Sequence, residues 1–502
     1  MSGGSLFAHR DFRLLLLGQT TSQLGAQVSG VAIPLLAVLT LHASPFELGL
    51  VTASSTLAFA VIGLPAGVWL DRWQRRPILV ASDLSRTVLL ATIPLAAAFG
   101  VLTLTQLVVV SLLTGVARVF FDVGYQSYIP SVIGRDRILA GNSSMETIRA
   151  SGQVVGPGLG GWLVAFAGAA NVVLIQAATF AVSAISLMAM RTCEPVVRPH
   201  VNQPRLRAQV MEGLAFVGRN RILRATAIAS AASNFAFAIA SAVSFIFMSR
   251  SLELSPAEIG VIIAAGSVTV TIAAAFTPRF TRRVGSARII WVSLSVTGPT
   301  TLLGPLAQPG WPVALFIVSV AAGEFGQIIY AITNVSLRQR FCPENMLGRV
   351  TATMRFLIMG LFPLGALLGG ILGELLGVRS TLWISGIIIV LSPVPLFLAL
   401  RHTRAVEDLP TWHTEPEQET ADPLTRWRDR GIERAGEPAS NAVIEQGHTR
   451  GNKPDVDSGT KKPMPIMPRD PSRIVMQQNG NAREAEHGPD ERPRIDIDPR
   501  RR

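Results

Sequence analysis

The chain has 502 residues, of which 49% are hydrophobic and only 16% are charged. Its mean hydropathy of +0.40 is too high for a soluble chain of this length, so we expect lipid to be its main solvent. A net charge of +12 would suit a nucleic-acid-binding protein. Because the excess arginine lies in short loops between apolar runs, we interpret it as topology charge and expect no nucleic-acid partner.

Twelve apolar runs are long enough to be membrane spans, because a helix needs about 20 apolar residues to cross a hydrocarbon layer. They lie at residues 14–40, 47–70, 78–100, 104–127, 142–167, 170–191, 222–248, 257–278, 287–305, 311–335, 349–375 and 379–401. None shows the alternation of a barrel strand. The sequence therefore predicts an all-α membrane protein with twelve transmembrane helices.

Arginine is distributed unevenly between the loops, which predicts the orientation. Loops after even-numbered runs hold nearly all the loop arginines, whereas loops after odd-numbered runs hold only Arg250 and Arg379. Arginine-rich loops stay on the cytoplasmic side. We therefore expect both termini in the cytoplasm and the chain in the inner (plasma) membrane of a bacterial cell.

The longest loop on the predicted cytoplasmic side, residues 192–221, separates two sets of six runs. We predict an N-terminal half at residues 1–191 and a C-terminal half at residues 222–401. The loop includes an amphipathic stretch, residues 205–220, which is able to lie along the membrane surface. Residues 402–502 lack sustained apolar periodicity and are rich in Pro, Glu and Arg, which predicts a disordered cytoplasmic tail.

A glycine pattern repeats between the two halves. Three positions recur at an offset of 209 residues: Gly156, Gly160 and Gly161 in the fifth run, and Gly365, Gly369 and Gly370 in the eleventh. Both runs also contain one proline. Repeated six-helix halves are typical of transporters, whose substrate sites lie between the repeats near the membrane midplane.

A compact charged cluster lies between the second and third runs. It consists of Gly67, Asp71, Arg72, Arg75 and Arg76. Topology charge alone would require no fixed spacing. The spacing resembles the inter-helix motif of the major facilitator superfamily, with Gln74 in place of a glycine. The resemblance implies that Asp71 meets the start of the eleventh span, where a helix N-terminus favours an anion. It also implies that Arg72 pairs with an acid in the fourth span and latches the cytoplasmic gate.

The fifth run carries a second motif, formed by Gly152, Gly156, Pro157, Gly160 and Gly161. Small residues let helix backbones approach, and proline bends a helix, so close packing alone would explain the pattern. It also resembles the antiporter motif of the same superfamily, although Ser143 replaces the first glycine of the longer pattern. In that family the motif is associated with drug and proton antiport, which implies export.

Charged residues inside spans need a partner or a water-filled cavity. Arg118 and Asp122 are four residues apart in the fourth run, so they face the same way. They either pair with each other or, by the resemblance, Asp122 accepts Arg72. Glu324 in the tenth run has no cation within one turn. It either forms an ion pair with a distant arginine or carries a proton or meets a cationic substrate.

Uncharged polar residues complete the predicted cavity. Gln19, Gln23 and Gln27 form one stripe in the first run, which either holds helices together or contacts substrate. The face that follows Glu324 carries Gln327, Tyr330 and Asn334, which we expect to line a cavity together with Tyr125 and Asn234. A cavity that mixes aromatic and few polar groups fits amphipathic ligands better than sugars.

Residues 5–401 resemble the superfamily's drug/proton antiporter family 3, which includes macrolide-efflux and enterobactin-exporter proteins. The entry to the first span, the entry to the seventh span and the junction of the tenth and eleventh spans carry the resemblance. Members often have an acid after the glycine of the first span, whereas here Ala26 follows Gly25. This departure implies that any proton coupling uses another group.

The sequence thus predicts a monomeric secondary transporter that expels an amphipathic small molecule in exchange for a proton. Its cargo would be a drug, a siderophore or another natural product. The alternatives are a facilitator without proton coupling and a non-transporting sensor or scaffold that acts through its tail. We expect no enzyme activity, cofactor or metal, because no GxxxxGK loop, ligand cluster or catalytic triad is present.

Overall fold

The computed structural model describes residues 9–70, 73–134, 138–192 and 206–406. The chain divides into two units, residues 1–420 and 421–502, and every described residue belongs to the first. Within the described residues, all regular structure is helical. Asp71 and Arg72 of the predicted charged cluster lie outside the described residues, as does the predicted tail from residue 407 onward.

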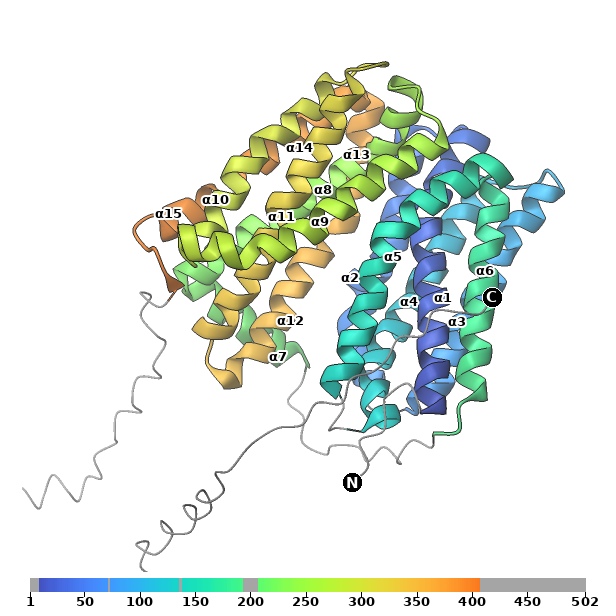
Figure 1. Cartoon of the computed structure of the whole chain (residues 1–502), viewed down its shortest axis with the longest axis horizontal. Coiled ribbons are helices and arrows are strands. Elements are labelled where there is room, and N and C mark those ends of the chain that lie inside the picture. The colour runs from blue at the N-terminus through green and yellow to red at the C-terminus, as the bar shows by residue number, and fades with distance from the viewer. Residues whose placement is uncertain (1–8, 71–72, 135–137, 193–205, 407–502) are drawn as a thin grey trace, which may run out of the picture. The chain divides into compact units, whose positions relative to one another are not determined.

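The N-terminal half contains six long helices (Figure 1). They are α1 (Arg10–Leu35), α2 (Pro45–Leu70), α3 (Arg75–Ala98), α4 (Leu104–Ile133), α5 (Ile138–Ala167) and α6 (Ala169–Ala189). A short π-helix, η2 (Leu36–Thr40), continues α1. Pro157 does not interrupt α5.

The C-terminal half repeats this order with more breaks. It contains α8 (Arg221–Ile246), η4 (Phe247–Ser251), α9 (Pro256–Val284), α10 (Arg288–Thr297), η5 (Gly298–Leu306), α11 (Val313–Phe341), α12 (Glu344–Gly360), α13 (Phe362–Leu376), α14 (Val378–Leu391) and α15 (Val394–Leu400). The eleventh predicted span is split at Leu361, just before Pro363, which has no amide hydrogen to donate.

The predicted spans agree with the helices to within a few residues. Eleven helical segments among the described residues are long and apolar enough to cross a membrane. Helix α5 has 30 residues but is not one of the eleven. Its many glycines and its Glu146 and Arg149 lower its hydropathy. The membrane fold is confirmed, while the count of twelve spans and the cytoplasmic position of the termini stay predictions.

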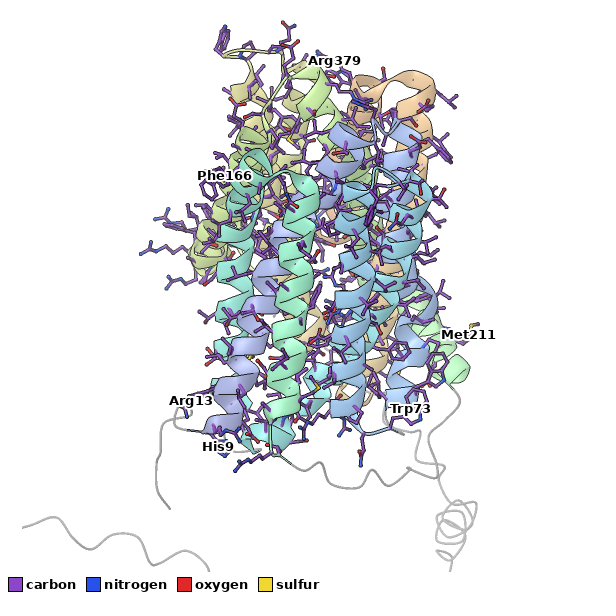
Figure 2. All side chains as sticks on the ribbon, turned by 90° about the vertical axis from the view of Figure 1, so that its right-hand side faces the viewer. His9, Arg13, Trp73, Phe166, Met211 and Arg379 are labelled. Carbon is purple, nitrogen blue, oxygen red and sulfur yellow. The ribbon has the colours of Figure 1, made fainter. Side chains whose placement is uncertain are left out.

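Helix ends fall into two groups. We call one the Arg-rich end, where α1, α3, α5, α8, α10 and α12 begin. We call the other the opposite end, where α2, α4, α6, α9, α11 and α14 begin. Figure 2 shows His9, Arg13 and Trp73 at the first end and Arg379 at the second. At the opposite end, Gly168 and Gly377 adopt positive φ angles of 83° and 86° and connect consecutive helices through one residue.

The amphipathic stretch between the halves forms helix α7 (Leu206–Arg219). It packs against α12, where Arg349 forms an ion pair with Glu212. Gly213 leaves room for Thr353 and for the backbone of Arg349. The structure shows that this stretch is helical and packs on the C-terminal half, while a position along the membrane surface stays a prediction.

The C-terminal boundary of the folded part lies later than predicted. We expected the tail to begin at residue 402, yet residues 402–406 pack on the turn between α9 and α10. The Ala287 amide donates a hydrogen bond to the Arg404 carbonyl at 3.1 Å. Val406 is 8% exposed, and its amide donates to Ser286 Oγ at 2.8 Å. The apolar side chain of Val406 supplies the burial that our composition-based boundary overlooked.

Candidate functional site

The glycines of the predicted antiporter motif let α5 approach two other helices. A Cβ atom on Gly160 would lie 2.6 Å from the Val28 carbonyl of α1. Gly156 lies directly against the side chain of Gln27, and a Cβ atom on Gly152 would lie 3.8 Å from the same side chain. These glycines hold α5 against α1 within the N-terminal half. The packing explanation given for the motif is therefore correct for these three residues.

Gly161 has a different neighbour, because it faces α9 of the other half. A Cβ atom on Gly260 would lie 2.8 Å from the Gly161 Cα atom and 2.6 Å from the Pro157 carbonyl oxygen. Distances below 3.0 Å would force backbone to move. The end of this motif therefore forms a contact between the two halves, close to the opposite end of the molecule.

The second half makes the equivalent contacts. Gly365 and Gly369 of α13 pack on the α8 backbone, where a Cβ atom on Gly369 would lie 2.5 Å from the Ile239 carbonyl. Gly370 faces Gly49 of α2 across the halves, and a Cβ atom on Gly49 would lie 2.8 Å from Gly370 Cα. The glycine repeat predicted from the sequence thus has a structural counterpart at every position.

Polar contacts add to this closure at the opposite end. Arg250 of η4 donates to the Ala43 carbonyl at 2.9 Å. The Phe46 amide, in the first turn of α2, donates to Glu374 at 3.4 Å. Both hydrogen bonds join the halves. A helix N-terminus is a favourable place for a carboxylate, so Glu374 strengthens the contact that the glycines allow.

The described members of the charged cluster lie at the Arg-rich end. Arg76 donates to the carbonyls of Leu187 and Met188 at 3.0 and 2.8 Å. It thereby caps two carbonyl groups in the last turn of α6. Gly67 is half-buried in α2, and no atom lies within 4 Å of its Cβ position. Arg75 is half-buried at the start of α3. Asp71 and Arg72 lie outside the described residues, so the contact of Asp71 with the eleventh span and the pairing of Arg72 with Asp122 stay predictions.

Arg118 and Asp122 form the pair that their spacing permits, with 3.5 Å between Arg118 Nε and Asp122 Oδ2. Their side chains are 72% and 44% exposed. Charged side chains on membrane-spanning helices seldom contact lipid. The exposed pair therefore indicates that this face of α4 is accessible to water.

The three glutamines of α1 differ in environment. Gln19 is only 4% exposed, whereas Gln23 and Gln27 are half-buried. Gln23 and Gln27 lie beside the glycines of α5. Their position supports a role in helix packing, one of the two roles left open by the sequence.

Glu324 lies on α11 beside α9, where its Cγ atom is 3.8 Å from the Cβ position of Gly266. It is half-buried, and it has no ion pair or hydrogen bond with any described residue. The distant arginine partner that we considered is therefore absent from the described part of the chain. Gln327, one turn further along α11, is also half-buried.

Tyr330 and Asn334 correct our expectation of a single open face on α11. They are 2% and 6% exposed, inside the C-terminal half. Tyr330 shares a hydrogen bond with Ser230 of α8 and donates to the Thr226 carbonyl at 3.2 Å. Their hydrogen bonds to α8 turn both side chains inward. Asn234, also on α8, donates to the Ser230 carbonyl at 3.0 Å and is half-buried.

The predicted cavity residue Tyr125 stacks on Phe121, with 5.9 Å between ring centroids. Its hydroxyl group is covered and has no hydrogen-bond partner in the described part of the chain. A covered hydroxyl without a partner is costly. In this conformation the Tyr125 side chain therefore packs against the hydrophobic core of the N-terminal half.

A buried ion pair in α3 was not predicted. Asp83 is fully buried, and Arg86 is 5% exposed and bonded to it. The Arg86 guanidinium also lies over the rings of Phe121 and Phe180, at 4.4 and 4.1 Å from their centroids. The signal was present in the sequence, since two opposite charges three residues apart interrupt an otherwise apolar run.

Metal binding finds no support in the described residues, where no group of three or more His, Cys, Asp and Glu side chains is placed to hold an ion.

Comparison with known proteins agrees with this architecture. The family model of the Major Facilitator Superfamily matches residues 15–361 and 226–435. The multidrug efflux pump Tap of Mycolicibacterium fortuitum is 29% identical over 399 residues, which cover 77% of this chain and 95% of Tap. The enterobactin exporter EntS of Salmonella typhimurium is 26% identical over 408 residues, covering 81% of this chain and 96% of EntS.

Solved structures confirm the fold. A bacterial homologue of the iron transporter ferroportin, in an inward-facing state, matches with a TM-score of 0.65 at 16% identity, over 79% of this chain and 99% of that one. The nucleoside transporter NupG matches with a TM-score of 0.63 at 14% identity, over 78% of this chain and 98% of that one. The chain is a multi-pass protein of the inner membrane, and it belongs to the Major Facilitator Superfamily, a family of membrane transporters.

Proposed function

We propose that this transporter is a proton-coupled exporter of amphipathic small molecules that works by alternating access. The observation that carries the proposal is the contact of Gly161 with Gly260, because it places the antiporter-type motif at the junction of the halves. The similarity to the multidrug efflux pump Tap supports export and an amphipathic cargo.

The contacts between the two halves support assigning this conformation to one step of the transport cycle. The glycine contacts between halves lie near the opposite end. If the Arg-rich end faces the cytoplasm, as its charge predicts, this conformation is closed toward the outside. A binding site between the halves would then be accessible from the cytoplasm, where an exporter collects its cargo. The exposed Arg118 and Asp122 would line that opening.

Glu324 is the best-placed group to carry the proton. A half-buried carboxyl without a described partner is able to exchange a proton as its surroundings change from wet to dry. Inward movement of one charge through 100 mV releases about 2.3 kcal/mol, which is available to drive export. Ala26 occupies the position at which relatives often carry an acid in the first span, so proton coupling would use another group, for which Glu324 is our candidate.

Efflux of a fluorescent amphipathic dye from cells expressing the chain tests this proposal. We expect efflux that a protonophore abolishes and that falls to the level of cells lacking the protein in a Glu324→Gln variant. A Glu253→Gln variant is the control, because this acid lies in the loop before α9. Efflux that continues in the presence of protonophore would contradict proton coupling. Dye uptake in place of efflux would contradict the direction.

A siderophore or another natural product is a second candidate cargo. The similarity to the enterobactin exporter EntS favours it. Export of a panel of siderophores from cells that make them, compared with dye efflux, distinguishes the two cargo classes. Deletion of residues 407–502 tests the alternative of a sensor acting through its tail, because transport should survive the deletion in an exporter.

A further inference from the structure

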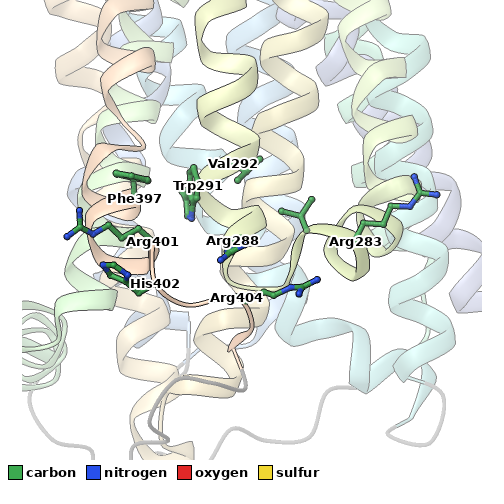
Figure 3. A pocket seen from close by; sticks show the side chains of 9 residues that line it. Arg283, Arg288, Trp291, Val292, Phe397, Arg401, His402 and Arg404 are labelled. Carbon is green, nitrogen blue, oxygen red and sulfur yellow. The ribbon is translucent and has the colours of Figure 1, made fainter.

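A pocket of about 700 Å³ opens at the Arg-rich end of the C-terminal half (Figure 3). It lies between the end of α9, the start of α10 and the segment that follows α15. Five of its lining residues are basic: Arg283, Arg288, Arg401, His402 and Arg404. None of the nine lining residues is acidic. The pocket therefore favours an anion.

The backbone holds these cations in place. Arg404 accepts hydrogen bonds from the amides of Ala287 and Arg288 at 3.1 and 3.4 Å. Gly285, with a φ of 106°, leaves room for the Arg404 side chain, whose Cγ would lie 2.8 Å from a Cβ atom there. The segment after α15 is thus fixed against the α9–α10 turn. Like charges held near one another repel, so a bound anion would stabilise this arrangement.

The inner wall of the pocket is aromatic and contains an unused donor. Trp291 and Phe397 pack edge to face, with 5.0 Å between ring centroids. Trp291 Nε1 is covered and has no hydrogen-bond acceptor in the described ranges. Figure 3 shows the Trp291 side chain directed toward the arginines. Because the Nε1 atom is covered, the Trp291–Phe397 pair contributes an apolar wall beside the arginines and no donor to an anion in the open pocket.

The apolar surface continues from the pocket toward the middle of the membrane. Phe397 and Val394, successive turns on α15, are 40% and 45% exposed, and Leu391 beyond them is 58% exposed. On α10, Val296 is 67% exposed, one turn beyond the lining residue Val292. This apolar track would gain nothing from a soluble anion. It matches acyl chains that run from a headgroup at the arginines.

We infer that the pocket binds the phosphate-bearing headgroup of an acidic phospholipid, whose acyl chains lie along Phe397 and Val296. Basic pockets between the ends of membrane helices are suited to such headgroups. The arginines supply bidentate donors to the phosphate, and the Trp291–Phe397 pair forms the apolar wall beside it. The inference concerns a site away from the junction of the halves and does not depend on the cargo or on proton coupling.

Lipid binding to the purified full-length chain in neutral detergent tests the inference. Quenching of Trp291 by phosphatidylglycerol with brominated acyl chains, taken as the difference from a Trp291→Phe variant, reports occupancy. Brominated phosphatidylcholine tests the need for a net negative headgroup. Soluble glycerol 3-phosphate, added as a competitor, tests whether a phosphate without acyl chains suffices.

An Arg288→Gln/Arg401→Gln variant removes two charges from the pocket, and Arg279→Gln/Arg282→Gln removes two from the same end outside it. We expect the apparent affinity for phosphatidylglycerol to fall at least about tenfold in the first and less than about twofold in the second, since only the first loses charge-assisted hydrogen bonds to the phosphate. If the first variant does not fold, Arg283→Gln/Arg404→Gln replaces it.

Three results would overturn the inference. Equal losses in the pocket variant and the control variant would mean that the lipid responds only to general surface charge. Equal quenching by phosphatidylcholine would mean that the headgroup charge is irrelevant. Competition by glycerol 3-phosphate at the same concentrations as the lipid would assign the pocket to a soluble phosphate.

Discussion

Gly161 of α5 and Gly260 of α9 meet backbone to backbone across the two halves, with no side chain between them. Their counterparts Gly370 and Gly49 meet in the same way on the other side of the junction. Close approach of backbones is the strongest packing available between helices in lipid, where burial of apolar surface gives no advantage. These two contacts therefore decide how firmly the opposite end is closed.

A single methyl group at this junction should disturb transport. In a Gly260→Ala variant the new Cβ atom would lie 2.6 Å from the Pro157 carbonyl, so we expect the closed state to lose about 1–3 kcal/mol. Dye efflux should fall, and spin labels at Val101 and Trp311 should report a wider opposite end. The matched control is Gly30→Ala, because no atom lies within 4 Å of its Cβ position. Normal efflux in Gly260→Ala would show that closure tolerates the methyl group.

The buried ion pair of α3 should contribute to stability in a way that an exposed pair does not. Arg86→Met leaves Asp83 buried without its cation, which should cost about 3–5 kcal/mol of unfolding free energy. Arg149→Met breaks the Arg149–Glu146 pair, whose side chains are 47% and 63% exposed, and should cost less than about 1 kcal/mol. Thermal unfolding in detergent compares them. Equal shifts in unfolding temperature for Arg86→Met and Arg149→Met would contradict the stabilising role of the buried pair. The double variant Asp83→Leu/Arg86→Met should recover part of the stability lost in Arg86→Met.

The placement of Tyr330 gives a prediction about what does not contact cargo. A Tyr330→Phe variant loses the hydroxyl that bonds to Ser230 and the Thr226 carbonyl, so the unfolding free energy should drop by about 1 kcal/mol. The apparent affinity for dye should stay unchanged, because this group is 2% exposed. An altered dye preference at unchanged stability would instead show that Tyr330 lines the substrate cavity, as the sequence predicted.

Burial raises the pKa of the Cys342 thiol to about 11. At neutral pH this leaves less reactive thiolate than at an ordinary cysteine, so alkylation should be slow and should accelerate about tenfold per pH unit until the pKa is reached. Maleimide labelling of a Cys193→Ser variant, followed from pH 7 to 10, measures this. A rate that is already fast at pH 7 and flat above pH 9 would show that the thiol is exposed.

Much of the architecture was predictable because lipid imposes a simple rule on the backbone. A span must be long, apolar and helical, so the run at residues 170–191 could be located to within two residues of α6, Ala169–Ala189. The glycine offset also identified the repeat, since small residues recur wherever two helix backbones touch.

The direction of individual polar side chains was less predictable. Tyr330 and Asn334 share one side of α11, yet sequence spacing alone does not say whether that side meets α8 or open space. Asp83 and Arg86 were overlooked for a related reason. Their spacing was visible in the sequence, but the burial of Arg86 involves Phe121 and Phe180, which come from two other helices.

The crosswise pattern of the junction also bears on the origin of the chain. Gly49 and Gly260 are 211 residues apart, Gly161 and Gly370 are 209 apart, and each contact joins a member of one pair to a member of the other. A twofold homodimer shows the same pattern, because residue i of one subunit meets residue j of its partner and j meets i. If a six-helix ancestor formed such a homodimer, glycines at only two positions would have created both contacts. Duplication and fusion of its gene would then have kept both contacts within a single chain.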